Sequence, residues 1–446
     1  MRYIDLFAGA GGLSEGFIRE GFEPIAHVEM NEDACFTIKT RLAYYSLKNK
    51  GMLNIYEKYL KSAITRNELY EYLPKDELNS VINLEISDNT IDTIFSQIDK
   101  LNRGKKVDLI IGGPPCQAYS VIGRARDKNK MVGDTRNRLF LQYANFLEKY
   151  EPKAFVFENV TGLITAGGGT YLCEMLDKFN LLGYKVNIHL EKTKNNEKLD
   201  IFNTSDYGVL QSRKRIIIVG YKNTIDFEFD LSKFQIDTKS FNVKDDLLAD
   251  LPSLQPNETK KIAFYNKNIT EYQQLSLLRD DDFDFTTQHI ARPHNSRDLE
   301  IYQIAIKLWL EERKRLSYAN LRADLKTHKN QEVFSNRFQV VNPFGVTHTV
   351  VAHISCDGHY YIYPDLSQIR SISVREAARI QSFPDNFFFE GSRTSAFKQI
   401  GNAVPPMFAQ QIAKAVKYSR IGENHFQSTP LNTYETREPI FELEAA

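Results

Sequence analysis

The stretch Asp5-Leu6-Phe7-Ala8-Gly9-Ala10-Gly11-Gly12-Leu13 carries the strongest signal for the fold. An apolar run precedes it and a helical pattern at residues 14–20 follows it, so it predicts a strand, a glycine-rich turn and a helix. Glycine permits positive φ and lets a ligand approach the backbone closely. This order of elements is typical of the first ligand-binding turn in an open α/β sheet.

The rest of the first 223 residues repeats this alternation of short apolar strands with helical stretches, which predicts a doubly wound, mostly parallel sheet. Residues 45–80 are expected to be a helical insertion to which no chemistry can be assigned. The expected strands are residues 3–7, 23–28, 107–111, 154–158, 185–190 and 215–221. We therefore expect an α/β fold.

The composition changes after residue 223, which predicts a second, smaller domain at residues 224–345 with a helix at 299–315. Residues 346–418 are expected to return to the first domain (1–223) and complete it. This return segment is expected to hold a hairpin of residues 346–355 and 360–363 around Asp357-Gly358, a helix at 374–381 and a strand-turn-helix at 399–415. The acidic tail at 419–446 is expected to be loosely held.

The bulk composition favours a cytoplasmic protein. The 446 residues carry zero net charge and four scattered cysteines, which suits a reducing compartment. No apolar run approaches the ~18 residues needed to span a membrane, so no membrane partner is expected. A polyanion would have to meet local basic patches, and residues 124–138 and 313–337 are two such patches. No metal is expected, because in the predicted hairpin His348 and His353 point to opposite faces.

A carboxylate follows the second expected strand, where Glu29 stands twenty residues after Gly9. In that position it can accept hydrogen bonds from both hydroxyls of a ribose. The dinucleotide fingerprint requires a third glycine where this chain has Ser14, and no basic side chain precedes Arg19 to meet a pyrophosphate. The pattern therefore favours S-adenosylmethionine as cofactor and leaves a nicotinamide-dependent oxidoreductase as a remote alternative.

Cys116 stands on a Gly/Pro turn directly after the strand at 107–111. A thiol of ordinary pKa is only a few per cent ionised at neutral pH, so its site must help the substrate accept it. If the substrate is cytosine, thiolate attack on C6 prepares C5 for methylation, and an acid at N3 assists. Glu158 ends the next strand at the same edge and is the expected acid. Arg213 and Arg215 are expected on one face, to hold the base carbonyl or orient Glu158.

These residues together resemble the cytosine-C5 DNA methyltransferases over roughly residues 3–223 and 346–416. The matching motifs are residues 5–12, Pro115-Cys116-Gln117, Glu158-Asn159-Val160, Gln211-x-Arg213-x-Arg215, residues 375–384 and residues 399–406. The resemblance implies the S-adenosylmethionine-dependent methyltransferase fold, with residues 224–345 as the target-recognition domain. It also implies the cofactor-binding residues Phe7, Ala8, Gly9, Gly11, Gly12, Leu13, Glu29, Met30, Ile86, Pro114, Asn402 and Ala403.

The resemblance further implies a target cytosine flipped out of double-stranded DNA by a loop at 120–138 that closes over the duplex. The expected DNA-contacting residues are Gln117, Ser120, Ile122, Arg124, Arg126 and Arg136. The chain departs from the family where an aspartate usually meets the adenine amino group, since Glu85 stands there. We expect a monomeric two-domain enzyme, and family habit implies that it is paired with a restriction endonuclease in a prokaryotic restriction-modification system. A tRNA cytosine-C5 methyltransferase of the same fold is the alternative.

Overall fold

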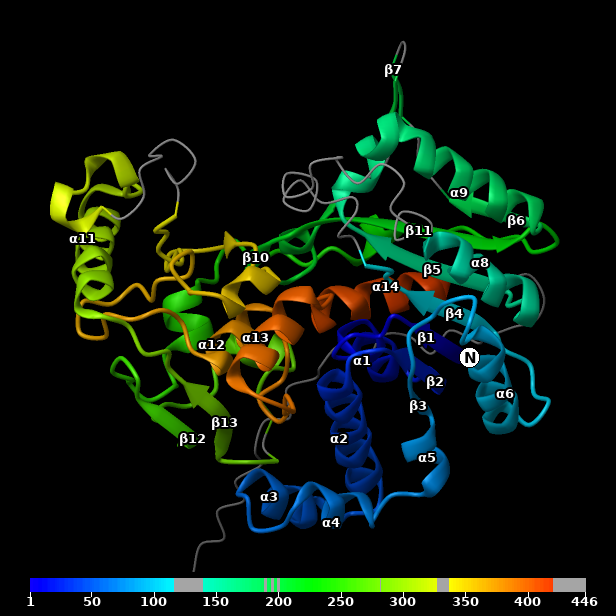
Figure 1. Ribbon diagram of the computed structural model, residues 1–446, viewed down its shortest axis with the longest axis horizontal. Coiled ribbons are helices and arrows are strands. Elements are labelled where there is room, and N and C mark those ends of the chain that lie inside the picture. Colours follow the sequence, from blue (N-terminus) through cyan, green and yellow to red (C-terminus); the bar gives the residue numbers. More distant parts are fainter. Residues whose placement is uncertain are drawn as a thin grey trace, which may run out of the picture.

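The computed structural model describes residues 1–115, 139–187, 191–193, 196–198, 201–280, 282–326 and 337–419. Figure 1 shows an elongated molecule, with a large sheet at one end. At the other end lie α11 (Ser296–Glu312), β12 (Thr259–Phe264) and β13 (Phe285–Ile290). The helices α12 (Val374–Ile380), α13 (Arg393–Asn402) and α14 (Pro406–Tyr418) run between these two ends (Figure 1). None of the helices in the described ranges is long and apolar enough to cross a membrane.

The large sheet confirms the predicted doubly wound, mostly parallel architecture. Its strand order is β3-β2-β1-β4-β5-β11-β6, and β9 pairs with the start of β11. The first five strands of this order are parallel, whereas β11 is antiparallel to both of its main neighbours. The strands are β1 (Arg2–Leu6), β2 (Glu23–Glu29), β3 (Val81–Asn83), β4 (Leu109–Gly112), β5 (Ala154–Asn159), β6 (Tyr184–Asn187), β9 (Phe202–Asn203) and β11 (Lys214–Lys222).

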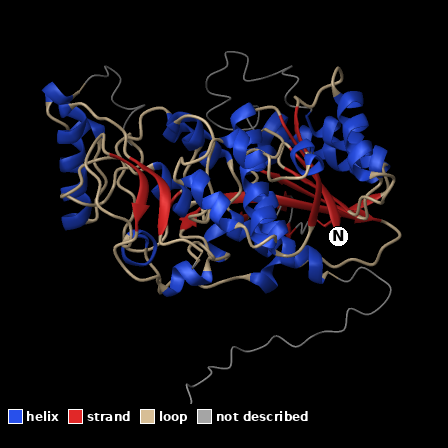
Figure 2. Ribbon diagram, turned by 90° about the horizontal axis from the view of Figure 1, so that it is seen from below, coloured by secondary structure: helices blue, strands red, loops and turns tan. Residues whose placement is uncertain are grey.

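Helices cover both faces of this sheet, as Figure 2 shows. One face packs on α1 (Gly12–Arg19) and α14 (Pro406–Tyr418), and the other packs on α6 (Ile91–Asn102), α8 (Leu139–Tyr150) and α9 (Thr170–Leu181). Successive residues of a strand point to opposite faces, and both sets are buried here, so the strands are almost wholly apolar. The continuous apolar runs in the sequence have this origin.

The contact between α1 and α14 is unusually close, because two glycines of α1 face α14 and the residues just before it. A Cβ atom on Gly12 would lie 2.3 Å from the carbonyl oxygen of Val404. A Cβ atom on Gly16 would lie 2.3 Å from the backbone nitrogen of Gln410. These two helices lie far apart in the sequence and pack side by side in the structure.

The predicted helical insertion is present and consists of three short helices after α2 (Glu32–Asn49). They are α3 (Leu53–Leu60), α4 (Arg66–Tyr70) and α5 (Lys75–Asn79). A capping box between Thr65 and Glu68 starts α4. The insertion buries aromatic side chains against α2 and against Phe285 of strand β13. The three-residue strand β3 directly follows α5, and the sequence prediction missed it because so short a strand gives no periodic pattern.

The other end of the molecule contains a two-stranded sheet and several helices. The expected helices at 299–315 and 374–381 are confirmed as α11 and α12. The bounds are β12 (Thr259–Phe264), β13 (Phe285–Ile290), α10 (Glu271–Leu275), α11 (Ser296–Glu312), α12 (Val374–Ile380) and α13 (Arg393–Asn402). Strands β7 (Glu191–Thr193) and β8 (Asn196–Lys198) form a separate two-stranded antiparallel sheet.

Two local predictions for the return segment are wrong. The expected hairpin at 346–363 does not form, because β14 (Thr347–His348) pairs in parallel with the distant β10 (Gln211–Ser212) and Ala352–Ser355 is a 3-10 turn. The expected strand at residue 399 is the last part of α13. The side chain of Ser392 caps that helix, and its apolar residues recur at helical spacing at Ala396, Phe397 and Ile400.

Candidate active site

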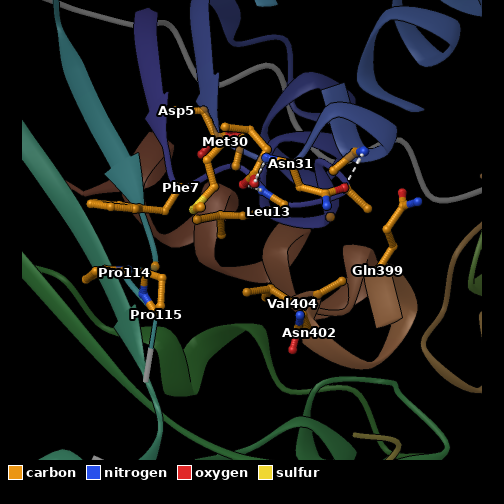
Figure 3. Close-up of a pocket in the computed structure, with 18 of the residues that line it drawn as sticks. Asp5, Phe7, Leu13, Met30, Asn31, Pro114, Pro115, Gln399, Asn402 and Val404 are labelled. Carbon is orange, nitrogen blue, oxygen red and sulfur yellow. Dashed lines mark hydrogen bonds between the residues drawn. The ribbon is translucent and has the colours of Figure 1, made fainter. Parts of the chain in front are cut away.

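A cavity of about 500 Å³ opens at the carboxyl ends of β1, β2, β4 and β5. In Figure 3, Asp5, Phe7 and Met30 line one side of it, and Gln399, Asn402 and Val404 of the return segment line the other. Nearly all predicted cofactor residues line this cavity: Phe7, Ala8, Gly9, Gly12, Leu13, Glu29, Met30, Ile86, Pro114, Asn402 and Ala403. Gly11, the residue that precedes α1, is the exception.

The glycine-rich turn owes its shape to positive φ angles. Gly9 has a φ of 55° and Gly11 a φ of 78°, values that glycine adopts without strain. Phe7 also has a positive φ, 57°, which is uncommon for a residue with a bulky side chain. Gly12 is needed for another reason, the close approach of Val404 described above. Phe7, Ala8 and Gly9 of this turn all line the cavity.

Glu29 ends β2 and its carboxylate is held by two backbone N–H groups. Gly9 donates to one oxygen at 2.8 Å and Asn31 donates to the other at 2.7 Å. Burial raises the pKa of Glu29 above its ordinary value, and these two hydrogen bonds act in the opposite direction. A carboxylate has about four acceptor positions, so each oxygen can still accept from a ligand hydroxyl. Glu29 can therefore accept hydrogen bonds from a ligand in the cavity, and its ribose-binding role stays a prediction.

Acidic side chains outnumber basic ones on the cavity wall. Asp5 is 1% exposed, and burial raises its pKa. Its Oδ2 faces His27, and its Oδ1 has no hydrogen-bond partner among the described residues. The carboxylates on the wall are Asp5, Glu29, Glu32, Glu85 and Glu158, against the basic residues Arg215 and Lys398. This lining suits a cationic ligand and disfavours a pyrophosphate.

Glu158 and Arg215 form an ion pair at the cavity wall. The Nε of Arg215 lies 2.6 Å from Oε1 of Glu158, and the two side chains are 11% and 12% exposed. The register of β11 against β5 places Ile217 opposite Glu158. Because β11 is antiparallel to β5, its first residues lie at the edge where β5 ends. The structure therefore places Arg215 where it can orient Glu158.

The turn that leads to Cys116 packs directly on this acidic residue. A Cβ atom on Gly113 would lie 2.7 Å from Oε2 of Glu158, so only glycine fits there without a shift. The side chain of Asn159 donates to the carbonyl oxygen of Pro114 at 3.3 Å. Pro114 and Pro115 both line the cavity (Figure 3). Glu158 and the residues that directly precede Cys116 thus lie on the same wall of the cavity.

The structure does not bring Arg213 to Glu158, contrary to the expectation that both arginines share one role. The Arg213 side chain is buried, and it donates to the carbonyl oxygens of Val350 at 2.7 Å and Gly401 at 3.2 Å. The reason is that residue 213 lies between β10 and β11 and outside the regular pleat. Arg213 therefore ties the return segment to the sheet.

Several predicted residues lie outside the described part of the chain. They are Cys116 and the expected DNA-contacting residues Gln117, Ser120, Ile122, Arg124, Arg126 and Arg136. Within the described ranges, no group of three or more histidine, cysteine, aspartate or glutamate side chains is arranged to hold a metal ion. The roles of these seven residues remain predictions.

Sequence reasoning missed several residues of the wall. Asn31 follows Glu29 by two positions and is the residue that caps the start of α2. An asparagine directly before a helical stretch is a recognisable capping signal, so its place near Glu29 could have been predicted. Gln399 precedes Asn402 by nearly one helical turn, so the true helix at 393–402 would have placed both on one face. The wall residues to which sequence reasoning assigned no individual role include Asp5, Asn159, Gln399 and Val404, which lie within the matching motifs, and Asn31, Glu32, Leu84, Ser395 and Lys398, which do not.

The sheet order, with one antiparallel strand and a cavity at the carboxyl ends of β1 and β2, defines the fold of the S-adenosylmethionine-dependent methyltransferases. A solved structure of a putative DNA modification methyltransferase encoded within a prophage, from E. coli, shares this fold with a TM-score of 0.60 and 22% identity. The alignment covers 94% of this chain and 98% of that one.

The chain belongs to the C-5 cytosine-specific DNA methylases, whose family model matches residues 1–66 and 75–418. It is 43% identical over 443 residues to the type II methyltransferase M.Bpa9945I of Bacillus paralicheniformis, covering 94% of this chain and 98% of that relative. It is 28% identical to the type II methyltransferase M.AgeI of Thalassovita gelatinovora, with coverage of 94% and 99%. The chain is thus an enzyme, a DNA (cytosine-5-)-methyltransferase.

Proposed function

We propose that this chain transfers a methyl group from S-adenosylmethionine to carbon 5 of a flipped-out cytosine in a specific double-stranded DNA sequence, through a covalent bond between Cys116 and C6. The observation that carries the proposal is the Glu158–Arg215 ion pair on the wall of the cavity, beside the turn that leads to Cys116. Membership of the DNA methylase family favours DNA over tRNA as substrate.

The cavity fits the proposed cofactor. Glu29 would accept the ribose hydroxyls, and the apolar side chains of Phe7, Met30 and Ile86 would contact the adenine. Met30 is 61% exposed in the cavity wall, and an apolar ligand would cover it. The buried Oδ1 of Asp5, which has no hydrogen-bond partner among the described residues, adds negative potential to a wall that suits a cationic methyl donor. S-adenosylmethionine supplies an electrophilic methyl group on a positively charged sulfur.

The residues of this chain perform the rest of the chemistry. The Cys116 thiolate forms a bond to C6 of the cytosine, while Glu158 holds a proton at N3, so that the ring takes up the electron pair without building a full negative charge. Arg215 keeps the carboxyl group of Glu158 in its orientation. After the methyl group reaches C5, loss of the C5 proton and of the cysteine restores the aromatic ring.

The remaining proposals concern DNA and partners. Residues 224–345 are proposed to read the target sequence, and the loop at 120–138 to close over the duplex. We propose that the enzyme acts as a monomer in the cytoplasm, as the modification partner of a restriction endonuclease, because its relatives named above are type II methyltransferases.

The proposal is tested with a DNA duplex that carries 5-fluorocytosine, which blocks release of the cysteine. The target sequence is first found by bisulfite sequencing of DNA from cells that express the chain. The parent enzyme is expected to become covalently attached to this duplex, and Cys116→Ser is expected to lose attachment and methylation. Cys173→Ser, at an exposed cysteine, is the matched control and should behave as the parent does. Attachment that survives Cys116→Ser would overturn the mechanism.

The role of Glu158 has a separate test. Glu158→Gln is expected to slow methyl transfer about 10²- to 10³-fold, the usual contribution of a general acid. Its affinity for S-adenosylmethionine should stay within about twofold of the parent, because the variant keeps the size of the side chain. Single-turnover methylation and calorimetric titration measure the two quantities. An unchanged transfer rate would exclude Glu158 as the acid.

The cells used for bisulfite sequencing also test the choice of nucleic acid. If their tRNA is methylated and their DNA is not, the tRNA alternative is favoured.

A further inference from the structure

The helices α3 and α4 have no role in the proposed chemistry, and the family model does not match residues 67–74 within this insertion. The insertion nevertheless lies close to the cofactor cavity, because it packs on α2, whose first residues line the cavity wall. It also contacts the loop between α12 and α13, through Glu390.

The side chain of Glu390 is 6% exposed, and the insertion supplies two of its three partners. Thr40 of α2 and Tyr59 of α3 both donate to its Oε1, each at 2.5 Å. The Nη1 of Arg66, on α4, lies 3.5 Å from Oε2 of Glu390. A buried carboxylate is costly unless it is paired and hydrogen-bonded. The insertion therefore stabilises the loop in its present position.

The same loop binds the side chain of Gln399, a residue of α13 on the cavity wall. The amide nitrogen of Gln399 donates to the carbonyl oxygen of Glu390 at 2.9 Å. The hydroxyl of Thr37 on α2 donates to the amide oxygen of Gln399 at 2.7 Å and accepts from the backbone N–H of Glu390 at 2.8 Å. Both ends of the Gln399 amide are thus fixed by groups that depend on Glu390 and α2.

We propose that the insertion is a brace for the cofactor cavity. Tyr59 and Arg66 fix the position of Glu390, and Glu390 in turn fixes Gln399 and thereby the part of α13 that lines the cavity. This proposal rests on the proposed function, because it takes S-adenosylmethionine as the ligand of the cavity. Glu390 and Tyr59 are positioning residues, since neither lines the cavity. A wall that is already ordered spares the ligand the cost of ordering it, which raises affinity.

The test compares three variants by calorimetric titration of S-adenosylmethionine into the DNA-free enzyme. Glu390→Ala removes the acceptor, and we expect its Kd to rise about tenfold. Tyr59→Phe removes one donor and should raise the Kd about threefold. Glu390→Gln keeps an acceptor oxygen toward Thr40 and Tyr59, so its Kd should stay within about twofold of the parent.

A kinetic measurement separates positioning from general damage. In Glu390→Ala the KM for S-adenosylmethionine should rise with the Kd, whereas kcat at saturating cofactor and the Kd for DNA should change less than about twofold. Tyr184→Phe is the matched control, because its hydroxyl donates to the carbonyl oxygen of Pro152 at 2.9 Å on another part of the sheet. It removes a hydroxyl that is more deeply buried than that of Tyr59 and should leave cofactor affinity unchanged.

Each outcome decides between the two proposals. A parent enzyme that does not bind S-adenosylmethionine would overturn the proposed function. A parent that binds it, together with a Glu390→Ala variant of equal affinity, would overturn only the brace. A uniform loss of kcat, DNA affinity and cofactor affinity in Glu390→Ala would also overturn it, because the residue would then be merely structural. If Glu390→Ala does not fold, the milder Tyr59→Phe decides by the same criteria.

Discussion

Two of the contacts between the return segment and the rest of the protein are built in opposite ways. At the α1–α14 contact, the backbones meet directly, and Gly16 leaves no room for even one carbon atom beside Gln410. At the α12 contact, the guanidinium of Arg379 is fully buried between the carboxylates of Asp250 and Asp385. The first contact depends on size and the second on charge.

The two contacts should therefore fail for different reasons. A close backbone contact is disrupted by added volume and is insensitive to protonation. A buried ion pair contributes little net stability when intact, because desolvation offsets the attraction, but its loss leaves an uncompensated buried charge. The stability supplied by the α1–α14 contact should not depend on pH. The stability supplied by the contact between α12 and residues 243–290 should depend on it.

The largest effect is expected at the charged contact. Asp250→Ala removes the carboxylate that accepts from Arg379 at 3.1 Å and from Gln273 at 2.9 Å. We expect a loss of about 4 kcal/mol in the free energy of unfolding, measured by urea denaturation. Asp237→Ala is the control, because Asp237 is 70% exposed and its pairing with Lys239 should be worth close to zero. Equal effects of the two substitutions would contradict the role given to buried charge.

A smaller effect is expected at the glycine contact. Gly16→Ala places a carbon atom against Gln410 and Ala409, and we expect a loss of about 2 kcal/mol. Gly21→Ala is the control, because no atom lies within 4 Å of its Cβ position and only its positive φ of 81° opposes alanine, at a cost of about 1 kcal/mol. The comparison breaks down if Gly16→Ala costs no more than Gly21→Ala. The effect of Gly16→Ala should be the same at pH 7 and pH 5.

The last effect, similar in size to that at the glycine contact, is a pH dependence at the charged contact, where His289 of β13 is hydrogen-bonded to the hydroxyl of Ser373 and the carbonyl oxygen of Pro252. Burial lowers the pKa of His289 to about 4. The unfolded chain therefore binds a proton near pH 6.5 and the folded chain does not, so stability is lost as the pH falls from 6.5 toward 4. This histidine alone should account for about 2 kcal/mol between pH 7 and pH 5.

That contribution is measured as the difference between the parent and His289→Gln in urea denaturation at the two pH values. Glutamine can still donate a hydrogen bond but does not titrate in this range, so the variant should lose less stability on acidification. Parallel pH profiles of the two proteins would exclude His289 as the source.

Much of the site could be predicted because its signals are local. Glu29 and Glu158 each end an apolar strand, and parallel strands bring such ends to one edge. The glycine-rich turn is defined by residues within one short segment. Arg215 was expected beside Glu158 for the same reason, since it begins a strand next to the one that Glu158 ends. In these cases a neighbouring run of sequence decides where the side chain lies.

The wrong predictions concern partners that are distant in sequence. A turn does form at Gly358, whose φ is 78°, but Ile362 pairs with Val340 and Ser371 and not with the strand expected across the turn. The buried Arg379 pairs with Asp250, 129 residues away, and no periodic pattern reveals such a pairing. Glu390 and Tyr59 are separated by 331 residues. Local periodicity locates elements, but it does not identify such contacts.

The anchored side chain of Arg213 has a consequence for the choice of arginine at the site. A strand that slides by two residues keeps each side chain on its original face, so such a slip of β11 would exchange Arg215 for Arg213 beside Glu158. The two carbonyl groups that hold Arg213 belong to Val350 and Gly401, in the last part of the chain. The register of β11 is thus fixed only after the segment that contains Val350 and Gly401 has been synthesised and has folded back onto the sheet.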